Sequence, residues 1–400
     1  MTDPARSQPG QSADGPSTAL VHHAYRPPAG FAAPQVAVHK ASTVLFADTA
    51  ALRARDARHK QGYTYGLHGT PTTFTLEARI AALEGGTECC LVPSGLAAIA
   101  LVNQALLKQG DEVLLPANVY GPSRELARHE LAAWGISHRL YDAMDPASLA
   151  AAITPTTKLV WLEAPGSVTM EFPDLRALTA LCRERGVLSA LDNTWGAGLA
   201  FNGFELGADV VMQALTKYPS GGGDVLMGSV VTRDSALHSR ILFTHMRLGL
   251  GVGANDAETL LRALPSMPLR YAAADAAGRT LAQWCAQQPA FSRVLHPALA
   301  GSPGHEHWAA QCRAAAGLFS VLVHPRYSAA QVDRFVEALR LFGIGFSWAG
   351  PMSLVVPYDL AAMRQPVPYE GTLVRFSIGL EDVADLQADV LQALQVMQAS

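Results

Sequence analysis

Between residues 75 and 260, apolar residues recur in two alternating patterns, one with helical spacing and one in short, nearly continuous runs. Helical spacing that ends in Gly-Gly predicts a helix over 75–86, and a serine ahead of an apolar stretch predicts another over 94–111. The continuous runs predict buried strands at 89–93, 112–116, 157–165 and 187–193. Since strands buried on both faces are typical of parallel sheets, this region predicts an α/β layered domain with a mostly parallel sheet.

The pattern changes after about residue 260, where a long, proline-interrupted helical segment precedes alternating strands and helices. Because 400 residues exceed what one compact core usually holds, we expect more than one domain. We divide the chain into an N-terminal segment over 1–65, an α/β domain over 66–260 and a smaller C-terminal α+β domain over 261–400. Residues 1–17, rich in Pro, Gly, Ser and Asp, predict a disordered leader without the features of a signal peptide.

Composition and charge argue against several classes of function. A formal net charge of −4 and the lack of a dense Lys/Arg tract are not typical of nucleic-acid binding. No apolar run reaches the ~18 residues of a membrane span. Five cysteines without CxxC spacing predict buried thiols, and His305 and His307 lack a zinc-site context, so we expect no metal site. These features predict a cytoplasmic protein.

The first unusual strand end is Ser94-Gly95-Leu96, where a predicted strand passes into a helix. The start of a helix offers unpaired N–H groups and a partial positive charge, and a glycine there allows an anion to approach the backbone. The segment would therefore suit a phosphate group. Ordinary helix capping explains the same residues, and both interpretations stay open.

Asp192 and Lys217 follow two later apolar strands. Such an acid either caps a helix or pairs with a cation, and such a lysine must be solvated, paired or neutral. The glycines of "SGGGD" (220–224) would let the backbone pass close to a ligand. An acid, a lysine and a phosphate site at adjacent strand ends together indicate pyridoxal phosphate (PLP). The lysine amine forms a Schiff base with the PLP aldehyde, and the acid keeps the pyridine nitrogen protonated.

Several segments of the chain resemble a known family. They are "LEAPGSVTME" (162–171), "LDNTWGAG" (191–198), "QALTKY" (213–218), "HPALAGSPGHEHW" (296–308) and "RFSIGLEDV" (375–383). From about residue 35 to the C-terminus the chain resembles the Cys/Met-metabolism family of fold-type I PLP-dependent enzymes, and within it the bacterial cystathionine β-lyases. The resemblance implies a large, mostly parallel PLP-binding domain followed by a smaller α+β domain.

The resemblance also assigns roles in binding the cofactor. Lys217 would be the Schiff-base lysine and would move the proton at the substrate Cα. Asp192 would pair with the pyridine nitrogen, and Tyr120 would stack on the ring and take part in catalysis. The phosphate would be held by Ser94, Gly95, Leu96 and the Thr216 hydroxyl.

On the substrate side, the resemblance assigns Arg375 to the α-carboxylate, for which a planar guanidinium suits bidentate binding. Ser347 and Trp348, in "FSWAG", would line the same side of the site. Without the resemblance, a lone arginine in "TLVRFSIG" is equally well explained by a structural ion pair.

The chain departs from the family pattern near the phosphate. Relatives carry a Tyr-x-Arg segment that a neighbouring subunit inserts there, whereas "YGLHGTPT" (65–72) matches the catalytic Tyr65 but has Leu67 in place of the arginine. Losing a charge-assisted contact costs roughly 1.5–3 kcal/mol unless a group such as His68 replaces it. An alternative register that begins at Tyr63 also lacks the arginine. Residues 1–65 would thus include an intersubunit arm, and the resemblance implies a homo-oligomer, a dimer of dimers.

The implied reaction is β-elimination of a sulfur amino acid. Cystathionine, or a related cysteine S-conjugate, would yield homocysteine or another thiol, pyruvate and ammonia. "APGSVTME" (164–171) and Trp348 match the β-lyase pattern, but "AGPMSL" (349–354) departs from it, so γ-lyase and γ-synthase reactions stay open. Two alternatives belong to other classes. One is a non-catalytic scaffold that has lost PLP, as Leu67 would favour, and the other is a nicotinamide dehydrogenase, to which only "GLGVGAN" (249–255) points.

Overall fold

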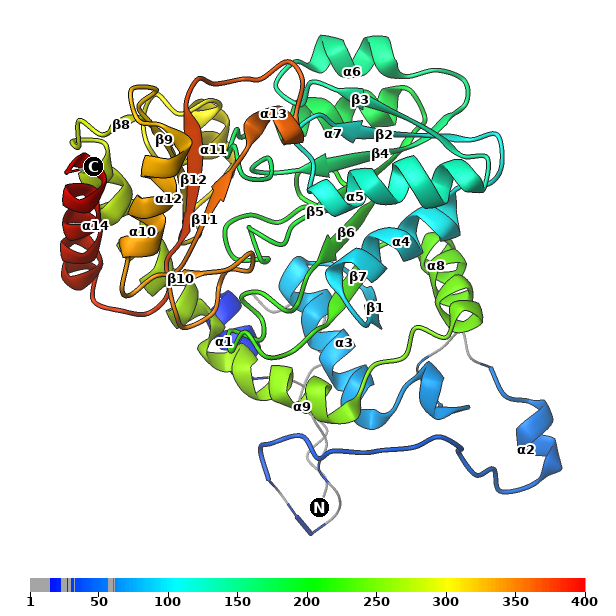
Figure 1. Cartoon of the computed structure of the whole chain (residues 1–400). Helices are drawn as coiled ribbons and strands as arrows, with labels where there is room; N and C mark the ends of the chain where they lie inside the picture. The colour runs from blue at the N-terminus through cyan, green and yellow to red at the C-terminus, as the bar shows by residue number, and fades with distance from the viewer. Residues whose placement is uncertain are drawn as a thin grey trace.

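Two sheets lie side by side in the structure, each covered by helices, and a long helix runs from the first to the second (Figure 1). The structure is a computed structural model that describes residues 15–22, 27, 30–31, 33–56, 60 and 62–399. The first sheet is large and mixed, and the second is smaller and C-terminal. The α/β fold class expected from the sequence is confirmed.

The first sheet has seven strands in the order β1-β7-β6-β5-β4-β2-β3. They are β1 (Glu88–Val92), β2 (Glu112–Pro116), β3 (Ser137–Tyr141), β4 (Thr157–Glu163), β5 (Leu188–Asp192), β6 (Val210–Gln213) and β7 (Gly228–Thr232). Neighbours are parallel except that β7 is antiparallel to both β1 and β6. Because parallel strands end at one edge of a sheet, the ends of β4, β5 and β6 lie next to one another.

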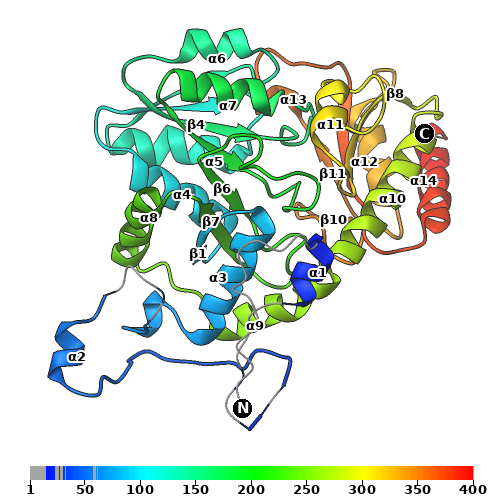
Figure 2. The same cartoon turned by 180° about the vertical axis from the view of Figure 1, so that it is seen from behind.

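Alternate residues of these strands face two helical layers, so both faces of the sheet are buried (Figure 2). One layer consists of α4 (Gly95–Leu106), α5 (Gly121–Leu126), the π-helical η2 (Ala127–Leu131) and α8 (Ser235–Leu248). The other consists of α3 (Pro71–Glu84), α6 (Pro146–Ala152), α7 (Leu175–Glu184) and α9 (Ala254–Ala263). Helix α3 begins before the predicted residue 75, because Thr70 is its N-cap, Pro71 is its first residue and Thr73 completes a capping box with Thr70.

The second sheet has five strands in the order β10-β11-β12-β9-β8. They are β8 (Phe291–Leu295), β9 (Leu318–Val323), β10 (Gly343–Ile344), β11 (Leu354–Tyr358) and β12 (Thr372–Ser377). One face packs on α10 (Met267–Cys285), α12 (Ala329–Ala338) and α14 (Val383–Gln398). On the other face, Leu318, Leu322 and Leu373 join the core of the first sheet. This packing brings β9 against the segment that follows β4, and the loop between β10 and β11 against the segment that follows β6.

Short elements complete the fold: α11 (His305–Gln311), α13 (Leu360–Met363), η1 (Gly66–His68) and η3 (Leu264–Ser266). The long helical segment expected after residue 260 is split, because η3, which contains Pro265, separates α9 from α10. None of the described helices combines the length and apolar character needed to cross a membrane.

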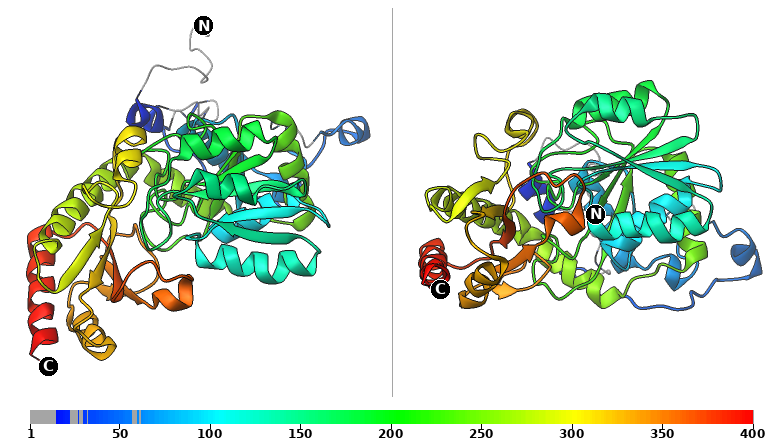
Figure 3. Two further views of the ribbon diagram at one scale, coloured as in Figure 1. Left: turned by 90° about the horizontal axis from the view of Figure 1, so that it is seen from above. Right: turned by 45° about the horizontal axis from the view of Figure 1, so that its top comes forward.

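The N-terminal segment projects from the body of the molecule, where α2 (Thr49–Arg53) buries no residue (Figures 1 and 3). By contrast, α1 (Pro16–Val21) packs against α3 and η3. Residues 1–14 of the leader predicted over 1–17 lie outside the described residues. Its last two residues belong to α1, so a disordered leader does not extend to residue 17.

Candidate active site

Lys217 lies just beyond β6, where the two sheets meet. Its Nζ donates a hydrogen bond to Ser347 Oγ at 2.9 Å and lies 5.1 Å from the centre of the Trp348 ring. Its backbone N–H donates to the Ala214 carbonyl at 3.0 Å, which closes the turn after the strand. The structure therefore brings together three residues that the sequence assigned to one site from distant parts of the chain.

The surroundings of Lys217 favour its neutral amine. The pKa of Lys217 is lowered to about 8, first by burial and then by the positive charge of Arg375, while the Asp192 carboxylate opposes the shift. A neutral amine is the form that accepts a proton or attacks an aldehyde. Near neutral pH this lysine is therefore a usable base and nucleophile.

Asp192 ends β5, the parallel neighbour of β6. Its Oδ1 accepts hydrogen bonds from the backbone N–H and hydroxyl of Thr194, at 2.9 and 2.5 Å. The same hydroxyl accepts one from the Ala214 N–H at 2.9 Å, so Asp192 is tied to the turn that carries Lys217. Burial raises the pKa of Asp192, while Thr194 and the charge of Lys217 lower it. The arrangement fixes one carboxylate oxygen in place.

Arg375 lies in β12 with its guanidinium buried. Its Nη2 donates to the carbonyl oxygens of Phe346 and Ser347, at 2.6 and 3.3 Å. Its Nε is buried and has no hydrogen-bond partner among the described residues. Burial lowers the pKa of Arg375, and the Tyr358 ring lies 5.4 Å from its Cζ. A buried guanidinium with an unpaired N–H is suited to bind an anion such as a carboxylate.

Tyr120 stands at the start of α5 with 41% of its surface exposed. Its backbone N–H donates to Glu163 Oε2 at 2.8 Å. Burial raises the pKa of the Tyr120 phenol, and the negative charges of Asp192 and Glu163 raise it further. The phenol therefore lies close enough to the ends of β4 and β5 for the charges of both carboxylates to act on it.

Two residues of this site are absent from the sequence-based list. Glu163 ends β4 in register with Asp192, and burial raises its pKa well above the ordinary value. The sequence does point to Glu163, because it is a charged residue near the end of the apolar strand predicted over 157–165. Tyr358, at the end of β11, carries no comparable sequence signal, because only the fold places it beside Arg375.

The predicted phosphate segment forms the start of α4. Ser94 Oγ accepts from the Ala97 N–H at 3.0 Å and so caps the helix. Gly95 is needed for packing, because a Cβ there would lie 2.6 Å from Ala214 Cβ. The Thr216 hydroxyl donates to the Met227 carbonyl at 3.2 Å, which holds this turn against the next strand. Both the capping and the phosphate interpretations of this segment remain compatible with the geometry.

Tyr65 and Leu67 lie away from this cluster, at the base of the N-terminal segment. The Tyr65 hydroxyl lies 3.4 Å from Ser42 Oγ, and its ring makes an edge contact with His68. Leu67 faces Gly251, where an added Cβ would come within 2.7 Å of its Cδ1. Gly251, in the segment "GLGVGAN", thus leaves room for the Leu67 side chain of the same chain, and this gives the segment a packing role.

A buried carboxylate anchors the segment that follows β4. Glu171 accepts hydrogen bonds from Asn118 Nδ2 at 2.7 Å and Thr169 Oγ1 at 2.6 Å, and it pairs with Arg364 Nη2 at 3.0 Å. Asn118 precedes Tyr120 by two positions, and Arg364 follows α13. The carboxylate therefore links the Tyr120 segment to the second sheet's connections.

The fold and these contacts bring a buried lysine, a carboxylate and an arginine together near the ends of parallel strands in an α/β domain. The family model for Cys/Met metabolism PLP-dependent enzymes matches residues 17–395. The chain is 39% identical over 376 residues to cystathionine beta-lyase of Bordetella avium, covering 92% of this chain and 94% of that protein. The chain therefore belongs to the Cys/Met metabolism family of PLP-dependent enzymes.

Other relatives are named for a different activity. Cystathionine gamma-synthase of Mycobacterium tuberculosis (strain ATCC 25618 / H37Rv) is 33% identical over 390 residues, covering 96% of this chain and 98% of that protein. The crystal structure of cystathionine gamma synthase from Xanthomonas oryzae pv. oryzae, in complex with aminoacrylate and cysteine, superimposes with a TM-score of 0.90. It is 28% identical and covers 97% of this chain and 100% of that chain. The family and its dependence on PLP are confirmed, and the relatives divide between β-lyase and γ-synthase.

Proposed function

We propose that this chain is a PLP-dependent carbon–sulfur β-lyase that cleaves cystathionine or a related cysteine S-conjugate. The observation that carries the proposal is the position of Lys217. Its amine, with a pKa lowered to about 8, lies within 2.9 Å of Ser347 Oγ and beside Trp348. For β over γ chemistry, the support is that one cystathionine beta-lyase is 39% identical to this chain, whereas the γ-synthase and further beta-lyases are 32–34% identical.

The residues present fit the cofactor of the family. Lys217 offers an amine that is readily neutral, and Asp192 offers a carboxylate held in place by Thr194. Helix α4, 12 residues long, begins beside the turn that carries Lys217, with Gly95 against Ala214, and its first N–H groups would suit the phosphate. Tyr120 would flank the ring. The chain supplies no arginine at position 67, so the phosphate would depend on α4 and on hydroxyl groups.

PLP, when bound, supplies an electron sink that stabilises negative charge at the substrate Cα. Arg375 would hold the α-carboxylate through its guanidinium, which would fix the Cα–H bond relative to Lys217. The Lys217 amine would accept the Cα proton, and the Cβ–sulfur bond would then break. Trp348 and Ser347 would keep the amine oriented and shield it from water.

The test is an assay of products from L-cystathionine. A β-lyase releases homocysteine, pyruvate and ammonia, whereas γ-elimination releases cysteine and 2-oxobutyrate, so the oxo acid separates the two reactions. Lys217→Ala should abolish turnover, and Arg375→Leu should mainly raise KM because the carboxylate loses a charge-assisted partner. Pyruvate release by Lys217→Ala at the wild-type rate would contradict the mechanism, and 2-oxobutyrate as the product would contradict the β assignment.

A further inference from the structure

A buried carboxylate lies behind the two strand ends that lead to Asp192 and Lys217. It belongs to Glu84, the last residue of α3, whose side chain is fully buried. Its Oε2 accepts a hydrogen bond from Asn193 Nδ2 at 2.8 Å, and its Oε1 accepts one from Gln213 Nε2. Both amide side chains are fully buried as well. Because solvent does not reach them, these two amide donors depend on Glu84 as their acceptor.

The two amides flank the segments with proposed roles in binding the cofactor. Asn193 follows Asp192 directly, and Gln213 is the last residue of β6. The next residue, Ala214, donates its backbone N–H to Thr194 Oγ1 at 2.9 Å, and that hydroxyl donates to Asp192 Oδ1 at 2.5 Å. The segments after β5 and β6 are thus joined twice, once through Thr194 and once through the buried carboxylate.

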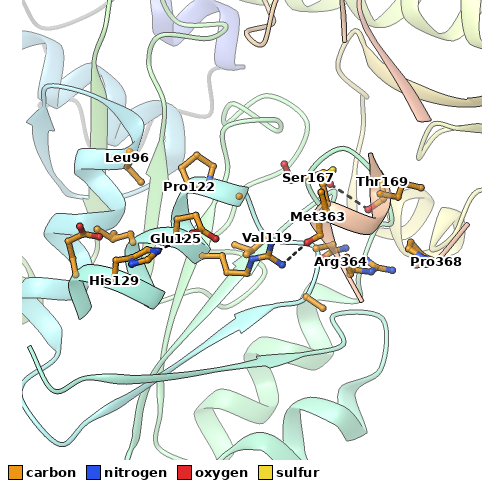
Figure 4. Close-up of a pocket in the computed structure, with 18 residues that line it drawn as sticks. Leu96, Val119, Pro122, Glu125, His129, Ser167, Thr169, Met363, Arg364 and Pro368 are labelled. Atoms are coloured by element: carbon orange, nitrogen blue, oxygen red, sulfur yellow. Dashed lines mark hydrogen bonds and ion pairs between the residues drawn. The ribbon is translucent and has the colours of Figure 1, made fainter. Parts of the chain in front are cut away.

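Glu84 is unlike Glu171, a buried carboxylate that follows β4. Glu171 pairs with the cation Arg364 at 3.0 Å and accepts a hydrogen bond from Thr169 at 2.6 Å. Figure 4 shows both of these partners beside a cavity of about 720 Å³ between α5 and α13. Glu84 has two neutral amides instead, so burial raises its pKa to about 7, and the negative charge of Asp192 adds to the shift. The carboxyl groups of Glu84 and Asp192 are therefore close enough to interact.

We infer that Glu84 is a positioning residue, which holds the Asp192 carboxylate in place relative to Lys217 so that both can engage one cofactor ring. The inference rests on the proposed roles of Asp192 and Lys217. The lysine is proposed to react at the aldehyde of PLP and the acid to pair with its pyridine nitrogen, so the relative position of the two segments decides whether both contacts form at once. Glu84 contacts neither substrate nor cofactor and acts through Asn193 and Gln213.

The test compares the dissociation constants of the full chain for PLP and for deaza-PLP, an analogue with a C–H in place of the pyridine nitrogen. Wild type should bind PLP more tightly, since the analogue gives Asp192 no partner. Glu84→Leu should lower this preference about tenfold, because the unpaired amides let the Asp192 segment shift. Glu84→Gln should keep the preference, because a glutamine facing one turned amide keeps both hydrogen bonds.

Glu112→Leu is the matched control. Glu112 is also buried, accepts a hydrogen bond from Thr157 Oγ1 at 2.7 Å and pairs with Arg139 at 2.7 Å. It begins β2, so it lies at the end of the sheet opposite the strand ends of the site. Glu112→Leu should leave the ratio of the two dissociation constants unchanged, even where it lowers Tm.

A second variant covers the case in which Glu84→Leu does not fold. Gln213→Leu removes one of the two links and should lower the preference for PLP about threefold. If either variant weakens PLP and the analogue equally, or leaves their ratio unchanged, Glu84 does not position Asp192 and the inference is wrong. Equal binding of PLP and the analogue by wild type would contradict the proposed role of Asp192 itself. The β-lyase activity is decided separately by the pyruvate assay.

Discussion

At the scale of single residues, the site depends on how the charges around Lys217 balance. Arg375 and burial both lower the pKa of the amine, and Asp192 raises it. Arg375 also has a buried Nε without a partner in the described part of the chain, so an incoming carboxylate would offset its charge. Under the proposed function, a substrate carboxylate bound at Arg375 would raise the pKa of Lys217, so that substrate binding and the basicity of the amine would be coupled.

The first prediction concerns the pH dependence of Lys217 in cofactor-free protein. Because its pKa is lowered to about 8 from the ordinary 10.5, reductive methylation with formaldehyde should rise steeply around pH 8 and level off above it. In Arg375→Met the midpoint should move to higher pH, because the positive charge of Arg375, which this variant removes, lowers the pKa of Lys217. Peptide mapping gives the labelled fraction of Lys217, and the exposed Lys158 serves as internal reference. A wild-type midpoint above pH 10 would contradict the prediction.

Sequence reasoning found the residues with unusual chemistry for their position and missed those that depend on packing. Lys217 and Asp192 stand out because a charge at the end of a buried strand needs an explanation. Glu163 gives the same kind of signal, but its strand was interpreted only for the fold. Tyr358 lies beside Arg375 because β11 pairs with β12. The pattern of residues within either strand does not predict this pairing. The roles of Arg375, Ser347 and Trp348 came from the family resemblance.

At the scale of elements, a buried polar network joins α3 to the ends of β5 and β6. Glu84, at the end of α3, accepts hydrogen bonds from Asn193 Nδ2 at 2.8 Å and from Gln213 Nε2. Burial raises its pKa to about 7, and the neighbouring Asp192 contributes to the shift. The amide oxygens of Asn193 and Gln213 are buried without partners among the described residues. With one of these amides turned round, so that its oxygen faces Glu84, protonated Glu84 or a glutamine in its place would supply the missing donor.

The second prediction is a pH-dependent stability difference between wild type and Glu84→Gln. A carboxyl with a raised folded pKa stabilises the fold below its unfolded pKa of 4.5, and that contribution is lost as the pH rises through about 7. Relative to the variant, the wild-type free energy of unfolding should therefore fall by about 3 kcal/mol between these pH values. Urea unfolding across this range measures it, with the exposed Glu184→Gln as control. A constant difference would show that Glu84 is not buried in neutral form.

The third prediction tests how α4 meets the turn that carries Lys217. Gly95→Ala would place a Cβ 2.6 Å from Ala214 Cβ, and overpacking of this kind costs about 1–3 kcal/mol of stability. Gly121→Ala is the matched control, because it also begins a helix and nothing lies within 4 Å of its added Cβ. Thermal unfolding should show a lower Tm for Gly95→Ala only. Equal Tm values would mean that the glycine serves a ligand and not the packing.

At the scale of the whole molecule, the apolar runs predicted β1, β2, β4 and β5, because most residues of these strands are buried, whereas β10 has no buried residue. They could not predict that β7 is antiparallel, since the direction of a strand depends on the connection before it and not on its own residues. Nor does local sequence explain the projecting N-terminal segment. Leu45 is 90% exposed there, and Leu52 of α2 is 41% exposed. Apolar side chains held in water on a projecting segment suit contact with another protein surface.

The fourth prediction is that this segment contacts a second copy of the chain. Leu45→Asp combined with Leu52→Asp should weaken self-association at least a hundredfold, because burying a leucine contributes about 1.5–3 kcal/mol. Size-exclusion chromatography with light scattering should give a multiple of 42.4 kDa for wild type and a smaller mass for the double variant. Leu391→Asp on α14, where Leu391 is 45% exposed, should leave the mass unchanged. If the double variant keeps the wild-type mass at low concentration, the segment does not bridge subunits, and Tyr65 and Leu67 at its base would have no route to a neighbouring site.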